Sequence, residues 1–296
     1  MIRTALILAA TLLPASAYAG GPDPILRYTF DDATNPTANS GTLGSDYDAI
    51  VGTGIAFTAF AGGFAIDKPT PLDQQTIPMG DENILDIADG DFTIVATVMT
   101  SFEDLSAPGG RFIITKNSSG NEDGWILAFR PDTGKAQFNI ADGSTSINVL
   151  SCTPINDGAP HTILGVRSGD RVALYVDGVL HASGDIPMGF GSTTDNNQQL
   201  HIGGRSSSFG PTGGLNDEFV GLIDNVELYD VALIDPPLAS IADLAPSYGI
   251  FDFSDVIAFL QFFGDEDPRA DLAPPSGVWD FSDVIAFLTA FGLGCS

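Results

Sequence analysis

Carboxylates dominate the side chains of this chain that could do chemistry. Its 38 Asp and Glu residues face only 11 Lys and Arg, which gives a formal net charge of −27. A field of that sign repels phosphate backbones and anionic lipid headgroups, which argues against nucleic-acid and membrane-surface binding. Neutral polymers and divalent cations fit the charge better. A simpler explanation is that the acidic residues keep a secreted protein hydrated and soluble.

Histidine, cysteine and glutamate form no catalytic motif in this sequence. His161, His181 and His201 lie far apart, without the Ser or Cys motif of a catalytic triad or the spacing of a zinc site. The glutamates are Glu82, Glu103, Glu122, Glu218, Glu227 and Glu266. None of them has a second carboxylate two residues away in a strand-like run. These residues therefore favour a noncatalytic binding protein.

The amino terminus predicts a secretory signal peptide over residues 1–19. Arg3 supplies a positive charge, and Ala5–Leu13 is an apolar run too short to cross a bilayer. Ala17-Tyr18-Ala19 has the small residues that a signal peptidase reads. No later segment approaches the ~20 apolar residues of a transmembrane helix, so we expect an extracellular or surface-attached protein without membrane insertion.

Short alternating segments predict an antiparallel β-sandwich over residues 20–234. In DFTIVATV, Phe92, Ile94, Ala96 and Val98 fall on one face, as the inward residues of a strand do. Residues 171–180 predict a hairpin, because Asp177-Gly178 tolerates the positive φ angles of a tight type I′ turn. Many such strands indicate a mainly β protein with a two-sheet jelly-roll sandwich.

Seven motifs occur in order along this region. They are YTFDD at 28–32, DGDFTIVATV at 89–98, FIITKN at 112–117, GWILAF at 124–129, PHTILGVRSGDRVALYVDGVLHAS at 160–183, LHIGG at 200–204 and GLIDNVELYDVAL at 221–233. Together they resemble the laminin-G-like, concanavalin A-like lectin/glucanase superfamily, which implies a concanavalin A-like jelly roll. Glycosidases of this fold that resemble laminarinases carry E-x-D-x-x-E on one strand, placing three carboxylates on one face. No such string occurs here.

Asp224 is the carboxylate that we expect nearest to the core. Strand periodicity over residues 221–229 places it on the apolar face, together with Val226 and Leu228. A buried charge needs a partner. The family resemblance suggests a calcium ion where the first and last strands meet, held by Asp224 with Asp31 or Asp32 and backbone carbonyls. The alternative is a carboxylate bonded to backbone amides at a strand end.

Sugar binding needs an exposed aromatic ring, with polar groups nearby for the hydroxyls. Phe190 and Phe209 lie in loops rich in Gly, Ser and Asn, where sandwich lectins keep their binding sites. Trp125 is a third candidate, although the alternation in GWILAF is more typical of a core residue. We predict ligand binding at these three residues, with Phe209 as the first choice.

A tandem repeat follows a proline-containing linker at residues 235–242. Residues 243–264 read DLAPSYGIFDFSDVIAFLQFFG, and residues 271–292 read DLAPPSGVWDFSDVIAFLTAFG, at an offset of 28. Each copy predicts a loop followed by a helix that is capped by its acidic residues. The predicted buried stripes are Val256, Phe259, Leu260 and Phe263 in the first copy and Val284, Phe287, Leu288 and Phe291 in the second. We expect Ile257 and Ile285 to fill the space between the helices.

This duplicated loop and helix, over residues 243–296, resembles a dockerin, specifically the Gly-Cys-ending dockerin-like tails of secreted planctomycete proteins. The resemblance implies a cohesin-like or cell-surface scaffold partner, and calcium in loops that begin at Asp243 and Asp271. The loops depart from that pattern, because Ala273 and Pro275 stand where side-chain oxygens belong. We therefore expect weak calcium binding or none in the tail, with folding carried by the apolar stripes.

Cys152 and Cys295 are the only cysteines of the chain. In an oxidising compartment they could form one bridge, or Cys295 could bond another molecule. The sequence leaves both arrangements open.

These features favour a secreted, noncatalytic lectin-like protein that binds extracellular polysaccharide or glycoprotein and is anchored through its tail. Ca²⁺ is the expected cofactor, and no nucleic-acid partner is expected. Two other classes stay open: a structural or adhesive surface protein that binds protein partners, and a polysaccharide hydrolase with an unrecognised site.

Overall fold

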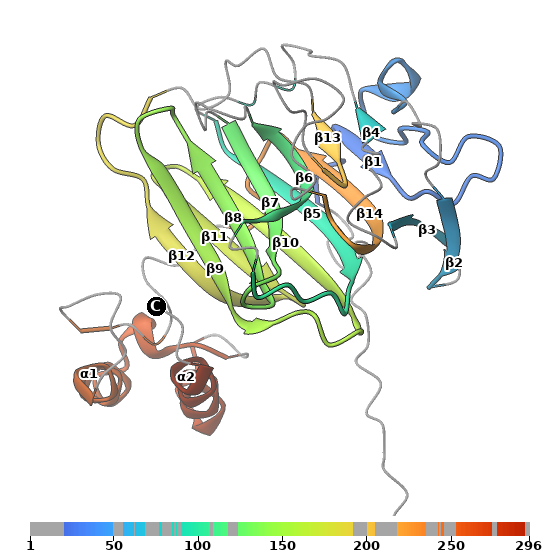
Figure 1. Ribbon diagram of the computed structural model, residues 1–296. Coiled ribbons are helices and arrows are strands. Elements are labelled where there is room, and N and C mark those ends of the chain that lie inside the picture. The colour runs from blue at the N-terminus through green and yellow to red at the C-terminus, as the bar shows by residue number, and fades with distance from the viewer. Residues whose placement is uncertain are drawn as a thin grey trace, which may run out of the picture.

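Two facing β-sheets and a separate pair of helices make up the computed structural model (Figure 1). It describes residues 21–49, 56–61, 63–68, 77–78, 85, 87, 90–106, 109–117, 124–191, 200–204, 218–234, 242, 244–245, 253–273 and 277–293. The predicted signal peptide lies outside the described residues, as do Phe209, Asp243 and Cys295.

The first sheet has eight strands within the described part of the chain, in the order β12-β11-β10-β5-β14-β3-β2, with β1 also paired to β14. Its strands are β1 (Leu26–Tyr28), β2 (Ala56–Phe60), β3 (Gly63–Lys68), β5 (Phe92–Met99), β10 (Pro160–Ser168), β11 (Arg171–Val176), β12 (Val179–Asp185) and β14 (Gly221–Tyr229). A short 3-10 helix, η2 (Gly44–Tyr47), follows β1.

The second sheet has six described strands, in the order β4-β13-β6-β7-β8-β9. They are β4 (Ile77–Pro78), β6 (Arg111–Asn117), β7 (Gly124–Arg130), β8 (Lys135–Ala141), β9 (Ser146–Pro154) and β13 (His201–Ile202). Neighbouring strands in both sheets pair antiparallel. The predicted mainly β sandwich of jelly-roll type is therefore confirmed.

The main hydrophobic core lies between the two sheets. The inward face predicted for β5 is confirmed, because Phe92, Ile94, Ala96 and Val98 are fully buried. The Phe92 ring lies 6.0 Å, centroid to centroid, from both Trp125 of β7 and Phe138 of β8. Aromatic rings from both sheets thus meet at the centre of the sandwich.

The predicted hairpin joins β11 to β12. Val176 pairs with Val179 at its base, and the two turn residues Asp177 and Gly178 have φ angles of 52° and 79°. Positive φ at both positions is the signature of a type I′ turn. The Asp-Gly signal is therefore confirmed, and it brings the Asp177 carboxylate to the end of the sheet.

The closing strand β14 contradicts the predicted orientation of Asp224. The register of β14 with β5 shifts between Asp224 and Glu227, and Asn225 has a φ of 48°. This bulge reverses the alternation, so Ile223 joins the core cluster that also contains Val226 and Leu228. Asp224 therefore lies on the opposite face of the sheet from those apolar residues.

The tail contains two helices of nearly equal length, α1 (Phe253–Gly264) and α2 (Phe281–Leu293), separated by the 3-10 helix η4 (Pro268–Ala270). Phe259 and Phe287 are 1% exposed, and their rings stack at 4.1 Å with an interplanar angle of 9°. The two predicted helices and their packing through these phenylalanines are confirmed. No helix among the described residues is long and apolar enough to cross a bilayer.

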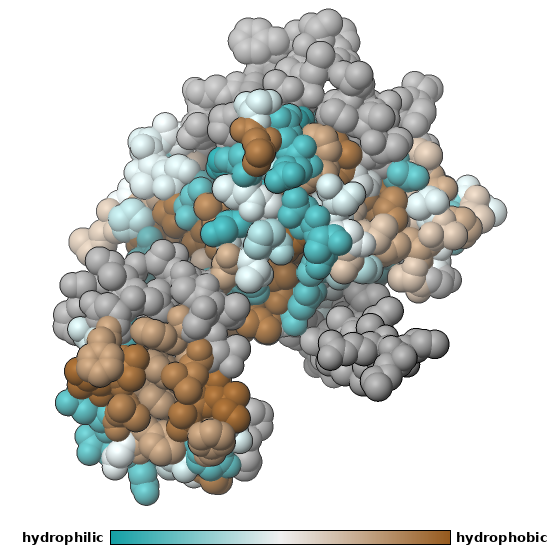
Figure 2. Space-filling view, turned by 60° about the horizontal axis from the view of Figure 1, so that its bottom comes forward, coloured by the Kyte–Doolittle hydropathy of each residue, from teal (hydrophilic) through white to brown (hydrophobic). Residues whose placement is uncertain are grey.

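Four of the apolar residues predicted to be buried in the tail are exposed instead. Ile257, Leu260, Ile285 and Leu288 are between 45% and 58% exposed. Successive helical residues are 100° apart, so Ile257 points away from Phe259, and the helix pair is too small to cover a second stripe. Figure 2 shows apolar side chains gathered on the surface of this unit.

Buried aspartates close the loops in front of both tail helices. Asp283, 0% exposed, accepts N–H hydrogen bonds from Leu272 and Ala273 through Oδ1 at 2.7 and 2.8 Å. Its Oδ2 accepts the N–H of Asp280 at 2.9 Å, while Oδ1 of Asp280 accepts the N–H of Ser282 at 2.7 Å. Both acids therefore accept N–H groups at the start of α2, which confirms their predicted capping role.

The first copy repeats part of this arrangement. Asp255, 1% exposed, accepts the N–H groups of Leu244 and Ala245 through Oδ1 at 2.7 and 2.8 Å. The 28-residue offset of the sequence is therefore reproduced in the hydrogen bonds that close each loop.

Candidate functional site

A groove of about 600 Å³ opens at the end of the first sheet, where β5 and β14 meet. Three segments line it: Met99, Thr100, Ser101, Phe102 and Glu103; Gly158; and Val220, Gly221 and Leu222. Small-molecule sites typically have volumes of about 300–1,000 Å³. The groove is therefore large enough to hold a ligand.

Thr100 ties the three segments of the groove together. Its Oγ1 donates to the carbonyl of Val220 at 2.7 Å and accepts the N–H of Phe102 at 3.0 Å. Its own carbonyl accepts the N–H of Gly158 at 3.0 Å. Because Thr100 is 3% exposed, these bonds are shielded from water and fix the backbone of the groove.

Gly221 allows β14 to begin close to β5. Its φ is 134°, and a Cβ at this position would lie 2.3 Å from the carbonyl oxygen of Met99. An L-residue would meet both a strained backbone and a clash. The floor of the groove therefore depends on glycine at this position.

The side chains of the groove combine apolar and polar surface. Phe102 is half-buried, and the guanidinium carbon of Arg111 lies 5.4 Å from its ring centroid. Ser101 and Glu103 are exposed beside it. An aromatic ring with a hydroxyl and a carboxylate nearby suits a polyhydroxylated ligand. Glu103 is the single carboxylate among the described lining residues.

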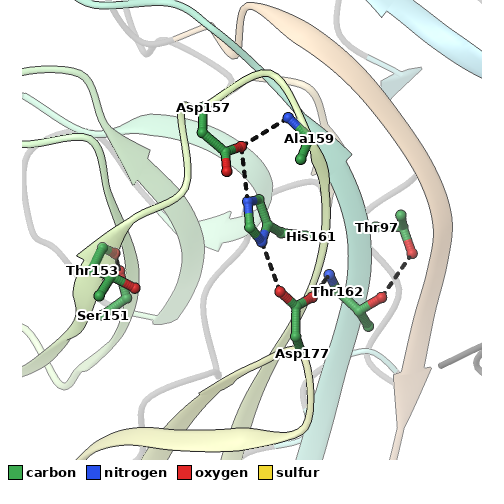
Figure 3. A network of polar contacts seen from close by, with 8 residues as sticks. All are labelled: Thr97, Ser151, Thr153, Asp157, Ala159, His161, Thr162 and Asp177. Carbon is green, nitrogen blue, oxygen red and sulfur yellow. Dashed lines mark hydrogen bonds and ion pairs between the residues drawn. The ribbon is translucent and has the colours of Figure 1, made fainter. Parts of the chain in front are cut away.

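His161 fastens one wall of the groove by bonding to two aspartates (Figure 3). Its Nδ1 lies 2.7 Å from Oδ2 of Asp177, and its Nε2 lies 3.1 Å from Oδ1 of Asp157. Asp157 also accepts the N–H of Ala159 at 2.8 Å, and Asp177 accepts the N–H of Thr162 at 2.9 Å. Since Asp157 precedes Gly158, these bonds position the groove wall.

The two carboxylates favour the protonated imidazolium. The hydrogen bond to Asp177 raises the pKa of His161, and the bond to Asp157 adds to this effect, although burial opposes both. The N–H of Ala159 lowers the pKa of Asp157. Burial works to raise the pKa of Asp177, but its bonds to His161 and Thr162 outweigh burial and lower it. His161 is therefore a charged link between two carboxylates.

This histidine cluster lacks a nucleophile among its described neighbours. The Oγ atoms of Thr97 and Thr162 lie 3.4 Å apart and share a hydrogen bond, and Ser151 donates to the carbonyl of Thr153 at 2.7 Å. In Figure 3, the hydroxyls of Thr97 and Thr162 face each other, and the Ser151 hydroxyl bonds to Thr153 rather than to the imidazole. The cluster therefore has the geometry of a structural link, not of a triad.

Asp224 and Asp31 meet at the gap between β1 and β3. β14 pairs with β3 through residues 221–223 and with β1 through residues 226–228, so the bulge at Asp224 faces the gap. Asp31, which follows β1, accepts the N–H of Phe64 in β3 at 2.8 Å. A Cβ on Gly63 would overlap the Asp31 carboxylate, so glycine permits this approach. The predicted meeting of the first and last strands is thus present.

Asp224 has the properties of a carboxylate that lacks a compensating charge. It is 4% exposed, and its two oxygens accept the N–H and Nδ2 of Asn225 at 2.8 and 2.7 Å. Burial first, and then the negative charge of Asp31, raise its pKa to about 7. Asp32, the other predicted partner, instead bonds to Thr34 and Asn35 in its own turn.

This pair fits a divalent cation in part. A cation would relieve the repulsion between Asp31 and Asp224, but calcium takes six to eight oxygen ligands. No group of three or more His, Cys, Asp or Glu at metal-binding spacing occurs among the residues that the structure describes. Backbone carbonyls and water would have to supply the remaining ligands.

The tail loops are closed by hydrogen bonds. Oδ2 of Asp271, the predicted first loop ligand, accepts the N–H of Gly277 at 2.6 Å, and its buried Oδ1 has no hydrogen-bond partner. Both oxygens of Asp283 already accept backbone N–H groups. Oδ1 of Asp271 is therefore one carboxylate oxygen in the described part of this loop that could bind a metal.

The two predicted sugar-binding aromatics that the structure describes, Trp125 and Phe190, do not line the groove. Trp125 is 0% exposed and belongs to the core, so it cannot stack on a ligand. Phe190 is half-buried, and the guanidinium of Arg167 lies 5.9 Å from its ring centroid. Arg167 pairs with Phe92, at the other end of β5 from the groove. Sequence reasoning missed Phe102 because nothing nearby in the sequence marks it as part of a groove.

Cys152, on β9, is disulfide-bonded, and its N–H donates to Nδ1 of His181 at 3.0 Å. The described residues contain no free cysteine.

The family of the chain follows from comparison with known proteins. A laminin G family model, described as the concanavalin A-like lectin/glucanases superfamily, matches residues 74–236, more than half of the chain. The chain belongs to this superfamily. A search of curated proteins found no match.

Solved structures show the same fold at low sequence identity. The binding domain of Paraclostridial mosquitocidal protein 1 has a TM-score of 0.57 at 14% identity over 72% of this chain and 50% of that one. The botulinum neurotoxin serotype G binding domain has a TM-score of 0.52 at 14% identity, over 72% and 49%. The present chain thus spans about half the length of these toxin domains.

A third similar structure covers a domain of matching size. Domain 4 of AbnA, an extracellular arabinanase of Geobacillus stearothermophilus in complex with arabinotriose, has a TM-score of 0.52 at 17% identity. The match covers 72% of this chain and 94% of that domain. At this identity the likeness concerns the fold.

The charged link at His161 predicts a pH-dependent stability. Because the pKa of His161 is raised above 6.5, its stabilisation should be complete below that pH and be lost as the pH rises through the raised pKa. Replacing His161 by Phe should cost about 1 kcal/mol at pH 6 and little at pH 9, since its aspartate partners are half-exposed. Urea unfolding at both pH values measures this difference.

Asp170→Asn, an exposed change at the opposite end of β10, is the matched control and should keep the wild-type profile. The raised pKa of Asp224 also lowers stability as the pH rises. The quantity to compare at each pH is therefore the difference in free energy of unfolding between wild type and variant. An equal loss at both pH values would show that His161 acts through packing alone.

Proposed function

We propose that this protein is a secreted, noncatalytic carbohydrate-binding protein whose sandwich domain binds an extracellular polysaccharide or glycoprotein. The groove beside β5 and β14 carries the proposal, because it sets a half-buried ring, a hydroxyl and a carboxylate on a backbone fixed by Thr100. The superfamily of the domain supports the proposal, as does the arabinotriose complex of the similarly folded AbnA domain.

Binding to polysaccharide is the direct test of this proposal. The purified protein should be retained on at least one insoluble neutral polysaccharide, such as arabinan, xylan or glucan, and be eluted by the soluble form of the same polymer. A matched sample with chelator shows whether retention needs a metal. No retention on any polymer under either condition would contradict the proposal.

Two other functions stay open and are separated by simple assays. A structural or adhesive protein would bind no polysaccharide but would bind a protein surface. A hydrolase would release reducing ends from the polymer that it binds, a readout that a noncatalytic protein cannot give.

The tail is proposed to attach the protein to the cell surface or to a scaffold, as a dockerin-like module with a cohesin-like partner. Its exposed apolar residues support this role: Phe253, Ile257 and Leu260 of α1 and Phe281, Ile285 and Leu288 of α2 are 45–73% exposed. The two sets are related by the 28-residue repeat. An apolar face of this kind on a helix pair is typical of a protein-protein contact.

Charge on this face should abolish attachment. The double variant Leu260→Asp and Leu288→Asp leaves the Phe259–Phe287 contact intact, so both helices should form while surface retention of the protein falls at least tenfold. Retention is measured by fractionating producing cells into surface and medium. The exposed change Gln261→Asp is the matched control, and unchanged retention of the double variant would contradict attachment by this face.

A calcium ion at Asp224 and Asp31 is the third part of the proposal. The raised pKa of Asp224 and the adjacent Asp31 charge support it, and backbone carbonyls and water would complete the ligand set.

A rise in pH should destabilise the calcium-free protein through Asp224, and added calcium should stabilise it. Its pKa is raised from 3.8 to about 7, so without calcium the free energy of unfolding should fall as the pH rises from 4 to 8, by on the order of 2 kcal/mol. Asp224→Asn should remove that fall. Added calcium should raise the Tm of the wild type at pH 8 by roughly 2–4 °C and leave Asp224→Asn unchanged.

Asp32→Asn is the matched control, because Asp32 bonds only within its own turn. Differential scanning calorimetry between pH 4 and 8 and at several calcium concentrations gives the pH dependence of stability and the calcium dependence of the Tm. Equal calcium stabilisation of wild type and Asp224→Asn would place the ion elsewhere.

A further inference from the structure

The described lining of the groove includes one acidic residue and no basic ones, and two aspartates adjoin lining residues in the sequence. Glu103 is the charged member of the lining, and it is exposed. Asp157, next to the lining residue Gly158, has a side chain that is 61% exposed. Asp104, next to Glu103, is 31% exposed. A ligand that enters this groove therefore meets a negative potential.

The arginines of the described residues are already engaged within the chain. Five ion pairs hold Arg27 with Glu227, Arg111 with Asp104, Arg130 with Asp132, Arg171 with Asp185 and Arg269 with Asp267. The sixth described arginine, Arg167, lies over the ring of Phe190. Arg111, the arginine nearest the groove, lies against the ring of Phe102 with its side chain 2% exposed. It is therefore shielded from a ligand by the residue that lines the groove.

We infer that this groove takes saccharides without anionic groups and rejects uronic acids, sialic acids and sulfated sugars. The inference rests on the proposed carbohydrate-binding function and names its ligand class. A carboxylate or sulfate on the sugar would lie near Glu103, and no basic residue among the described lining residues opposes that charge, so the repulsion discriminates against it. A sugar hydroxyl can instead donate to Glu103 while the apolar face of the sugar ring packs on Phe102.

The test uses one polymer in two charge states. The neutral polysaccharide that retains the protein is compared with its own carboxymethylated derivative by affinity electrophoresis and by calorimetry with soluble fragments. The wild type should bind the neutral form at least tenfold more tightly, and added salt should narrow the difference, because salt screens charge repulsion.

Two variants place the effect at the groove. Phe102→Leu keeps an apolar side chain but loses the ring, and it should weaken binding of the neutral polymer about tenfold. Glu103→Lys should weaken binding of the neutral polymer, and its affinities for the neutral and the carboxymethylated polymer should differ by no more than about threefold. Phe190→Ala and Asp170→Lys, both at the far end of β10, are matched controls that should leave both affinities unchanged.

Each result supports or overturns a defined part of the inference. Neutral binding that survives both Phe102→Leu and Glu103→Lys would place the ligand elsewhere, while the proposed function would stand. Equal affinity of the wild type for both polymers would overturn the charge selection. Failure of the wild type to bind any polymer would overturn both the proposed function and this inference.

Discussion

The pairing of β14 with β5 is the contact on which the rest of the sandwich depends. It joins residues 221–229 to residues 93–99, more than 120 positions earlier in the chain. One edge of β14 pairs with β5, and the other receives β1 and β3 in succession. The groove forms where β14 begins, and the acid pair forms where β14 bulges. Both features therefore depend on a single long-range pairing, whose loop-closure entropy must be overcome when the sheet forms.

The sequence predicts those features of the fold that local periodicity determines. The inward face of β5, the Asp177-Gly178 turn and the two tail helices each follow from residues close together in the chain. The bulge at Asn225 could not be predicted in this way, because one extra residue in a strand leaves the composition of the strand unchanged. Its only local signal is that asparagine tolerates positive φ.

The candidate groove was not predictable from local sequence for a different reason. Its lining comes from residues 99–103, 158 and 220–222, which are brought together by bonds to Thr100. None of these segments resembles a binding motif by itself. Two aromatic residues predicted to bind ligand have other positions: Trp125 lies in the core, and Phe190 packs beside Arg167. A residue in contact with ligand depends on loop geometry, whereas a core residue depends on strand periodicity.

In the tail, the apolar pattern of the helices does not determine which face is buried. Both helices are apolar on most of their circumference, so the pattern predicts that an apolar face is buried without deciding which one. The structure buries Phe259 and Phe287 and leaves the residues at 257, 260, 285 and 288 exposed. Hydrogen bonds from loop N–H groups to Asp255 and Asp283 connect each loop to the helix that follows it. The tail therefore keeps its outer apolar face available, since neither loop closure nor helix packing requires those side chains.

Acidic residues in this protein differ in charge state because their surroundings differ. The pKa of Asp177 is lowered because its bonds to His161 and Thr162 outweigh its burial, whereas the pKa of Asp224 rises to about 7 because it is buried beside Asp31. Glu103, in contrast, is exposed at the rim of the groove. Hydrogen bonding thus lowers the pKa of one acid, and burial raises the pKa of another. The selection against anions that we infer for the groove therefore depends on the exposed Glu103 and not on Asp104 and Asp157, which are paired with Arg111 and His161.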